Sequence, residues 1–373
     1  MNTLEALHDE AMDLAEEAFS AKRSGEAERA RALFRESLAR ESQVVEMVKA
    51  RFDYEPTRSI ILLGAASLAS NTGELDLAKR LAYMGLSGTP PDNVRDDLEH
   101  LLSETTMELE AAAAARELPS TAIGLAIDGS AVVADYTEAE PFVSRVTSLA
   151  RLFRRTYERV RGEPYRETGC PNLAVRVASR PFMSLTQPGS YRVTLRFGVQ
   201  GELPVIGTSQ QAIQDLMGKL EVLQSQGLGA LDAAIPDPAY RNNFVGLAKR
   251  LAPDGRHVSS VLLAANVGEE VSTLPLSQDL QRIPVRPIAR GRHPGKGKPV
   301  EVMGLLRHAS KEEDEESSIR LVDEGGKRHV ILVPTGMMND IVKPLWDEQV
   351  RVTGMKVGRL ITMENITPVS TDV

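Results

Sequence analysis

The sequence predicts a multidomain α+β protein, with an N-terminal all-α helical repeat, an α+β middle domain and a small C-terminal β-barrel. Up to Pro90-Pro91, glycine and proline are scarce, and the strong helix formers Ala, Leu, Glu and Arg dominate. After Pro119, helical and strand-like stretches alternate. The C-terminal segment reads as three strands, a helix and two more strands. Together these patterns indicate three structural regions.

The length and composition indicate how many domains the chain forms, what its core consists of and where the protein is located. A chain of 373 residues is long enough for two or three domains, and with 42% hydrophobic but only 4% aromatic residues its core is mostly aliphatic. The single cysteine, Cys170, cannot form an internal disulfide. The N-terminus lacks a signal-peptide pattern, and no run of about 18 apolar residues occurs. We therefore expect a cytoplasmic protein that does not use the membrane.

The charge is unevenly distributed along the chain. The net charge is −10 over residues 1–119, +6 over 120–299 and −4 over 300–373. Such asymmetry indicates regions with different partners, or an acidic region that docks on a basic one. The predicted division is a helical repeat domain at 1–117, a basic α+β domain at 120–283, a linker at 284–299 and a barrel at 300–373.

The N-terminal region is expected to contain about five helices. The breaks between them carry Gly or Pro turn signals, and they lie at Ser24-Gly25, Tyr54-Glu55-Pro56, Thr72-Gly73 and Thr89-Pro90-Pro91. A last helix over 92–117, with leucines along it, is suited to cover the end of a helical stack.

Two stretches of this region are similar to each other. Each begins at a glycine turn and then places comparable residues at the same offsets: Gly25 and Gly73, Ala30 and Ala78, Phe34 and Ala82, Ser37 and Gly85. Pro90 closes the second stretch. This pattern resembles the tetratricopeptide repeat over about 100 residues. Ala18 and Ala21 stand where that family usually has Gly and Tyr, the two stretches start 48 residues apart and not 34, and there are two, not three.

The resemblance implies that the leading helix of each unit lines a concave protein-binding surface. The residues placed there are Phe19, Lys22, Arg23, Leu63, Ser67, Ser70 and Asn71. A Lys-Arg pair beside an Asn can hold a partner's carboxylate. The alternative for each single residue is an ordinary solvated helix position.

The middle domain opens with a hairpin signal, Asp128-Gly129 between apolar runs, and with a capping box at Thr137 and Glu140. The helix that follows has one apolar face and one arginine face. Arg151, Arg155 and Arg159 are spaced i, i+4, i+8, so their like charges repel and predict an anion that compensates them.

Two strands are expected next, LAVRV around Arg176 and SYRVTLRF with Arg192 and Arg196 on its outer face. If they pair, one sheet face carries three arginines. Three interpretations remain open for these arginines: they bind nucleic-acid phosphates, they bind the acidic N-terminal region, or they form a solvated face. No exposed aromatic stripe for base stacking accompanies them.

Further helices are expected after a second capping box, Thr208 with Gln211, and after Asp237-Pro238, an N-cap followed by proline at the first helical position. The basic segment 284–299 reads as a semi-flexible linker or a phosphate-contacting strap. Its cationic residues include Arg290, Arg292, Lys296 and Lys298. Its GKGK run lacks the spacing of a phosphate loop.

The C-terminal segment resembles an OB-fold barrel by the order of its elements: strand, a hairpin turning at 324–326, a short helix at 336–347 and two strands. It is net acidic, and its one tryptophan, Trp346, lies on the predicted helix. A structural or protein-binding role is therefore favoured over binding of nucleic acid.

No motif for catalysis, metal or cofactor binding is recognisable. The six histidines lack paired ligand spacing, and Cys170 has no nearby histidine. We therefore expect a non-enzymatic adaptor or regulator without cofactors, which binds a partner protein through its N-terminal helical repeats. The alternative is a nucleic-acid-associated factor that uses the arginine-rich middle domain and the basic linker. A homo-oligomer stays open.

Overall fold

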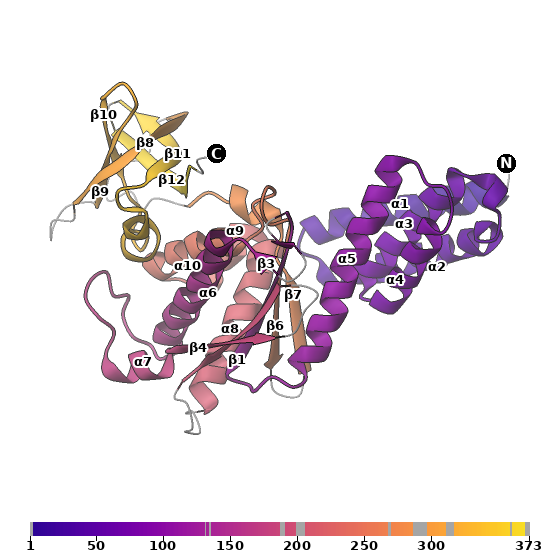
Figure 1. Ribbon diagram of the computed structural model, residues 1–373, viewed down its shortest axis with the longest axis horizontal. Helices are drawn as coiled ribbons and strands as arrows, with labels where there is room; N and C mark the ends of the chain where they lie inside the picture. The colour runs from indigo at the N-terminus through magenta and orange to yellow at the C-terminus, as the bar shows by residue number, and fades with distance from the viewer. Residues whose placement is uncertain are drawn as a thin grey trace. The chain divides into compact units, whose positions relative to one another are not determined.

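A computed structural model confirms the multidomain α+β fold (Figure 1). It describes residues 3–130, 132–133, 136–186, 191–198, 206–267, 270–285, 297–310, 317–358 and 360–369. The chain forms two compact units. The first comprises residues 1–118 with 262–265 and 271–275, and the second comprises the rest.

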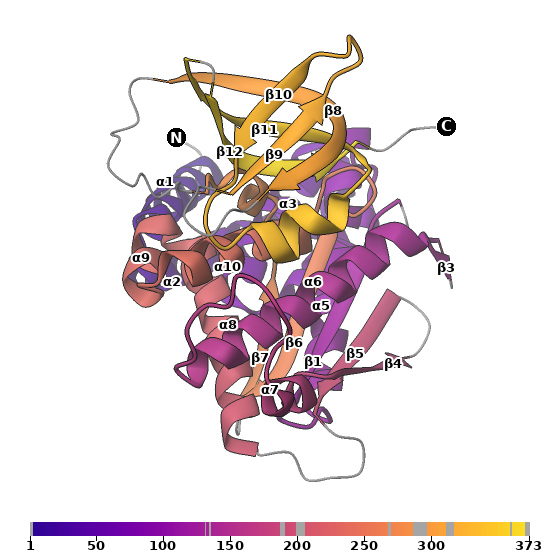
Figure 2. The same cartoon turned by 90° about the vertical axis from the view of Figure 1, so that its left-hand side faces the viewer.

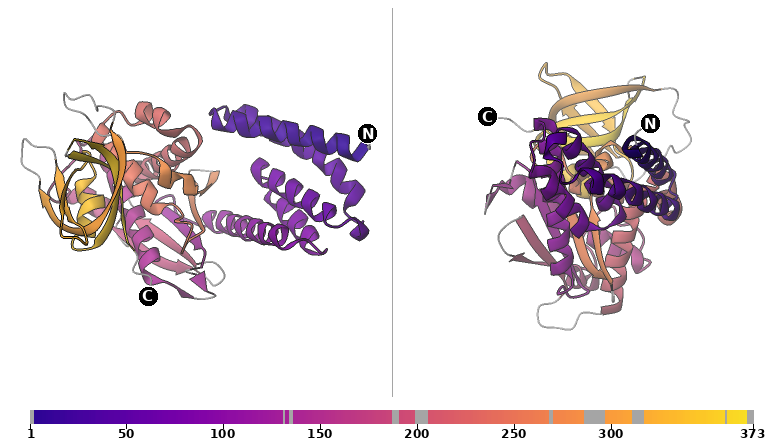
Figure 3. Two further views of the ribbon diagram at one scale, coloured as in Figure 1. Left: turned by 90° about the horizontal axis from the view of Figure 1, so that it is seen from above. Right: turned by 90° about the vertical axis from the view of Figure 1, so that its right-hand side faces the viewer.

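The N-terminal region is helical, as expected. Its helices are α1 (Thr3–Arg23), α2 (Ala27–Val48), α3 (Thr57–Thr72), α4 (Leu75–Leu86) and α5 (Asp92–Ala115), with a short 3-10 turn η1 (Phe52–Tyr54). Gly25 and Gly73 lie between paired helices with φ of 79° and 82°, a conformation that glycine adopts without steric cost. Figure 3 shows these helices from two further directions.

Small residues let these helices pack closely. Helix α1 packs on α2, and α3 packs on α4. Ala30 and Ala78, which occupy equivalent places in the two pairs, are both buried. A Cβ atom on Gly85 would lie 2.8 Å from a methyl group of Leu98, so a larger residue there would force the Leu98 side chain to shift. The core of the unit is mostly aliphatic, as the composition predicts.

The middle region is built on a five-stranded sheet of order β4-β5-β1-β6-β7. Its strands are β1 (Ala122–Asp128), β4 (Pro181–Thr186), β5 (Tyr191–Phe197), β6 (Ser260–Val267) and β7 (Glu270–Pro275). Its other elements are β2 (Val132–Val133), β3 (Tyr136–Thr137), α6 (Ala139–Val160), α7 (Leu173–Ala178), α8 (Ile206–Ser225), α9 (Gly227–Ala234), α10 (Pro238–Leu251) and η2 (Gln278–Arg282).

Helices α6, α8 and α10 lie together on one side of this sheet (Figure 2). Phe153 of α6 stacks on Phe197 of β5 with ring centroids 3.7 Å apart, which fixes α6 on that face. Asp237 caps α10 as predicted, because its carboxylate accepts hydrogen bonds from the amides of Ala239 and Tyr240.

Several local predictions for this region are wrong. The LAVRV stretch forms helix α7 and not a strand, and Arg176 therefore does not lie on the sheet. Strand β1 pairs with β5 and lies next to β6, whereas β2 pairs with β3, so no hairpin forms at Asp128-Gly129. Neither capping box forms, because α6 starts at Ala139 without a side-chain cap and α8 starts before Thr208.

The C-terminal region is a closed five-stranded barrel of order β10-β12-β11-β8-β9, and the predicted order of its elements is confirmed. Its elements are β8 (Lys298–Ser310), β9 (Ser318–Val322), β10 (Arg328–Leu332), the π-helical turn η3 (Met338–Val342), the 3-10 turn η4 (Lys343–Leu345), β11 (Gln349–Val357) and β12 (Leu360–Pro368). Strands β10 and β12 are parallel, and the other paired strands run antiparallel.

Among the described residues, no helix is both long enough and apolar enough to cross a membrane.

Candidate functional site

The residues predicted to bind a partner lie on the two leading helices. Phe19, Lys22 and Arg23 belong to α1, and Leu63, Ser67, Ser70 and Asn71 belong to α3. One direct contact joins the two groups, because the Lys22 ammonium donates a hydrogen bond of 3.2 Å to the side-chain oxygen of Asn71. The Asn71 amide in turn donates to the carbonyl oxygen of Ser67 at 3.0 Å. The structure therefore brings Lys22, Asn71 and Ser67 together.

An aromatic residue flanks this polar contact. Phe19 is 39% exposed and packs edge-on against the buried Phe34, with ring centroids 4.9 Å apart. The Lys22 ammonium lies 6.0 Å from the centre of the Phe34 ring. Arg23 is exposed and has no hydrogen bond or ion pair to another side chain that the structure describes. The face therefore offers a half-exposed ring and two cations, which suits a ligand with both apolar and anionic groups.

Two buried polar groups of this unit escaped sequence analysis. Arg58 is 1% exposed and donates hydrogen bonds to the carbonyl oxygens of Lys49 and Met84, each at 2.9 Å. Glu41 is fully buried on α2 and contacts the Nδ1 atom of His8 at 3.0 Å. Burial raises the pKa of Glu41, and the contact with His8 opposes this shift. Both groups connect helices inside the unit and are not part of the α1–α3 face.

The arginine face of α6 has partners within the chain. Arg151 donates to the carbonyl oxygen of Asp340 at 2.8 Å. Arg155 is 3% exposed and lies between the carboxylates of Asp340 and Glu158. Arg159 pairs with Asp215 of α8. The anions that the i, i+4, i+8 spacing predicts are therefore largely carboxylates of the same chain.

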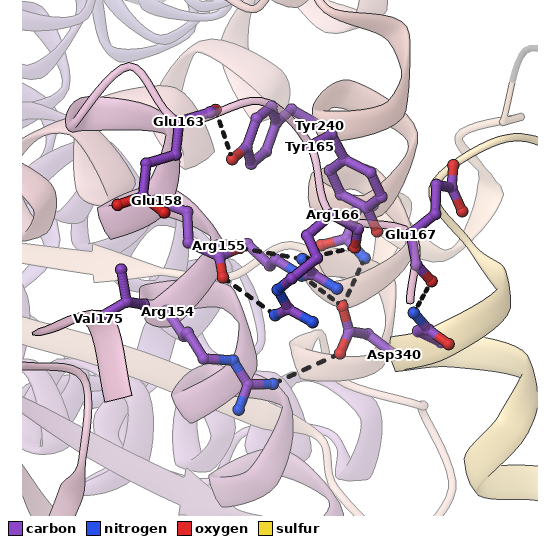
Figure 4. A network of polar contacts seen from close by, with 12 residues as sticks. Arg154, Arg155, Glu158, Glu163, Tyr165, Arg166, Glu167, Val175, Tyr240 and Asp340 are labelled. Carbon is purple, nitrogen blue, oxygen red and sulfur yellow. Dashed lines mark hydrogen bonds and ion pairs between the residues drawn. The ribbon is translucent and has the colours of Figure 1, made fainter. Parts of the chain in front are cut away.

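Asp340, in η3 of the barrel, is the centre of this network (Figure 4). Its carboxylate accepts hydrogen bonds from Nε of Arg155 at 2.7 Å and from the side-chain amide of Asn243 at 3.1 Å. Arg154 adds an ion pair at 3.5 Å. The neighbouring carboxylate, Glu158, is 2% exposed and accepts one hydrogen bond from Arg155 and one from Arg166.

Hydrogen bonds from α6, α10 and the loop before α7 also hold the segment around Asp340. The carbonyl oxygen of Gly336 accepts hydrogen bonds from the hydroxyl of Tyr165 at 2.7 Å and from Asn243 at 2.9 Å. Asn339 donates to the carbonyl oxygen of Glu167, and Arg250 donates to that of Ile341 at 2.8 Å. The segment 336–341 is thus fixed by α6, α10 and the loop before α7.

Burial governs the electrostatics of this network. It raises the pKa of Tyr165 and lowers that of Arg154. Burial combined with nearby Arg151 lowers the pKa of Arg250 to about 10. For Arg155, burial is more than offset by Tyr165 and by the carboxylates of Asp340 and Glu158, so its pKa is raised. These neighbours therefore favour the charged form of Arg155.

The remaining cations proposed for anion binding are dispersed. Arg176 is exposed on α7, and on β5 Arg196 is exposed while Arg192 is half-buried. Lys298 begins β8. Arg290, Arg292 and Lys296 lie outside the described residues.

Sequence analysis missed the carboxylates that pair with the α6 arginines. The available signal was Asp340 itself, a lone acidic residue between the apolar runs of GMMNDIV. In the part of the chain that the structure describes, no group of three or more His, Cys, Asp or Glu residues is arranged to hold a metal ion. Comparison with models of protein families gives no match, and neither does comparison with curated proteins or with solved structures.

Proposed function

We propose that the protein is a non-enzymatic adaptor or regulator that binds a partner protein through a tetratricopeptide-like N-terminal unit. Two helix pairs with small residues at their crossings support this, as does α5, which packs on α4 beside them. The observation that carries the proposal is the contact between Lys22 of α1 and Asn71 of α3. It joins the two leading helices, which line the binding surface in the family that the sequence resembles.

The chemistry of this face defines the partner. Lys22 uses one of its three N–H donors on Asn71, and Arg23 adds a second cation beside the half-exposed ring of Phe19. A carboxylate next to an apolar side chain is the complementary ligand. We propose that the partner presents such a group and that the C-terminal barrel, OB-like in strand order, has a structural or protein-binding role in the same cytoplasmic molecule.

The alternative, a nucleic-acid-associated factor, has weaker support. Of the helix arginines on which it depends, Arg155 and Arg159 are paired with carboxylates, and Arg151 donates to a backbone carbonyl. Binding of phosphates at these positions would have to displace intramolecular partners.

An affinity capture from native lysate with the full chain tests the proposal. The bait is compared with the double variant Lys22→Glu and Arg23→Glu, and with a matched variant, Arg31→Glu and Arg35→Glu, on the exposed face of α2. Each capture is divided into nuclease-treated and untreated halves, and the bound proteins are quantified by mass spectrometry.

We expect a partner protein whose capture survives nuclease treatment and is unchanged with the α2 variant. With the α1 variant the captured amount should fall at least about tenfold, which corresponds to a loss of about 1.4 kcal/mol of binding free energy. Capture that the α1 variant leaves unchanged would exclude this face. Partners that all disappear with nuclease would favour the nucleic-acid alternative.

A further inference from the structure

Strand β4 (Pro181–Thr186) forms one edge of the five-stranded sheet. It pairs with β5 alone among the strands that the structure describes. An edge strand has backbone N–H and C=O groups available to another strand, and natural edges are usually protected by lysine, proline or a bulge. The β4 edge carries proline only at its first residue, Pro181.

The register shows which backbone groups point outward. The amide of Phe197 donates to the carbonyl of Thr121, on the β1 side of β5, so the backbone groups of the preceding residue, Arg196, point to β4. Arg196 is opposite Phe182, and Thr194 is opposite Ser184. Phe182 and Ser184 therefore bond to β5, and the N–H and C=O groups of Met183 and Leu185 point to the free edge.

Apolar side chains are exposed around this edge. Met183 is 56% exposed although it is opposite the buried Leu195 on the face that α6 covers. In the short helix α7, which ends three residues before β4, Leu173 and Val177 are 68% and 40% exposed at i, i+4 spacing. Large apolar groups exposed this close to a free strand edge are typical of an interaction surface.

The opposite face of the same edge is cationic. Side chains alternate along a strand, so Phe182 lies with Arg196 on that face. Arg196 is exposed and has no carboxylate partner in the described chain. The guanidinium of Arg180 lies 5.3 Å from the centre of the Phe182 ring. No acidic residue occurs between Asn172 and Phe197 to balance these charges.

We propose that the β4 edge binds an extended segment of a partner protein in which apolar and acidic residues alternate, and that this segment adds a sixth strand to the sheet. The outward groups of Met183 and Leu185 supply the main-chain hydrogen bonds. Alternate side chains of the added strand then meet Met183 on one face and the Arg196 side on the other. This proposal uses none of the α1 and α3 residues and does not depend on their function.

The test uses a fluorescein-labelled octapeptide in which valine alternates with glutamate, and a control octapeptide with lysine in place of glutamate. Their binding to the full chain is measured by fluorescence anisotropy. We expect the glutamate peptide to bind at least tenfold more tightly than the lysine peptide, and more weakly at high salt because exposed charges are screened. Equal binding of the two peptides would overturn the proposal.

Two substitutions separate main-chain pairing from charge. Met183→Pro removes an outward N–H without removing a bond to β5, so it should reduce binding at least tenfold, whereas Met183→Leu keeps the N–H and should bind like the parent chain. Arg180→Glu combined with Arg196→Glu should reverse the preference toward the lysine peptide. Unchanged binding by a folded Met183→Pro variant would contradict strand addition.

Hydrogen exchange locates the peptide independently of any variant. The amides of Met183 and Leu185 should exchange at least tenfold more slowly when the peptide is bound, and the amides of β7, at the other edge, should not change. Protection confined to β7 or to another region would refute the assignment. Circular dichroism of each variant establishes that it is folded; if Met183→Pro is not, the charge reversal and hydrogen exchange decide.

Discussion

Asp340 shows how one residue can balance several charges far away in the sequence. It lies 185 residues from Arg155, yet the two atoms of their hydrogen bond are 2.7 Å apart. The Asp340 side chain is almost completely buried, so its carboxylate contacts Arg154, Arg155 and Asn243 in place of water. Removing one partner of a buried pair leaves an uncompensated charge, which costs more than the pair itself contributes.

We therefore expect Asp340→Ala to lower the free energy of unfolding by about 3 kcal/mol. The control is Glu301→Ala in the same barrel, which breaks an exposed pair with Arg351 and should cost less than about 1 kcal/mol. Urea unfolding followed by circular dichroism measures both. Equal losses for the two variants would show that burial of the Asp340 network contributes no special stability.

Lys249 provides a pH-dependent prediction. Its side chain is 4% exposed and donates one hydrogen bond, of 2.8 Å, to the carbonyl of Ile283. Burial lowers the pKa of Lys249 from 10.5 to about 8. The folded state thus binds this proton less tightly than the unfolded state. The stability that the group contributes is complete above pH 10.5 and is lost as the pH falls through 8.

Lys249→Met should therefore stabilise the protein at pH 7. The pKa difference is equivalent to about 3 kcal/mol, and the lost hydrogen bond offsets about 1 kcal/mol of it. We expect the variant to be more stable by about 2 kcal/mol at pH 7, with no advantage at pH 10.5. Urea unfolding at several pH values measures this, with the exposed Lys327→Met as control. A gain that does not change with pH would refute the electrostatic explanation.

The residue scale also shows the limits of the sequence analysis. Arg151 donates to a backbone carbonyl, whereas Arg155 and Arg159 pair with carboxylates, as the i, i+4, i+8 spacing predicts. Their identity was not predictable, because Asp215 and Asp340 reach α6 only through tertiary contacts. The contact between Lys22 and Asn71 was easier to anticipate, since the repeat resemblance places both residues near the ends of the two leading helices.

At the scale of elements, periodic patterns predicted most of the helices and strands. The five N-terminal helices, α10 with its Asp237 cap and all five barrel strands were predictable. Short patterns failed where local and tertiary contacts prevailed. In α7 the side chain of Asn172 accepts a hydrogen bond from the amide of Val175, and only Val175 of that stretch is buried, so the β-branched residues adopt a helix.

Gly336, which lies just before η3, has a backbone conformation and surroundings that require glycine. Its φ is +91°, and a Cβ atom there would overlap the carbonyl oxygen of Ala239. Gly358 has a φ of +63° but open space around it. We expect Gly358→Ala to cost about 1 kcal/mol from backbone strain alone, and Gly336→Ala at least about 3 kcal/mol. Urea unfolding compares the two, and equal costs would show that Ala239 yields easily.

At the scale of the whole molecule, the two compact units do not coincide with consecutive stretches of chain. The N-terminal helices group with segments 262–265 and 271–275 of β6 and β7. Thr273 of β7 donates a hydrogen bond of 3.0 Å to Glu108 of α5, which shows this grouping at one point. The composition change at Pro119 therefore marks a change of architecture and does not by itself mark an independent folding unit.

We accordingly expect that cutting the chain after Leu118 destabilises both pieces. The piece 119–373 should bind an apolar dye more strongly than the whole chain does, because Leu262 and Leu263 belong to the unit that has lost its helices. Its midpoint of thermal unfolding should fall by several degrees. An unchanged midpoint without dye binding would show that residue 118 is a true domain boundary.

The contacts that hold segment 336–341 determine what happens when the barrel is deleted from the chain. Arg151, Arg155 and Arg250 donate hydrogen bonds to this segment, and Arg154 forms an ion pair with Asp340. A shortened chain that ends before Lys298 would remove these partners of Arg151, Arg154 and Arg250, and would leave Arg155 with Glu158 and the carbonyl of Arg166 alone. Such a fragment would adhere to any polyanion, nucleic acid included. The barrel therefore cannot be removed without exposing cationic side chains of the middle region. Affinity for nucleic acid in a shortened chain would be an artefact of truncation.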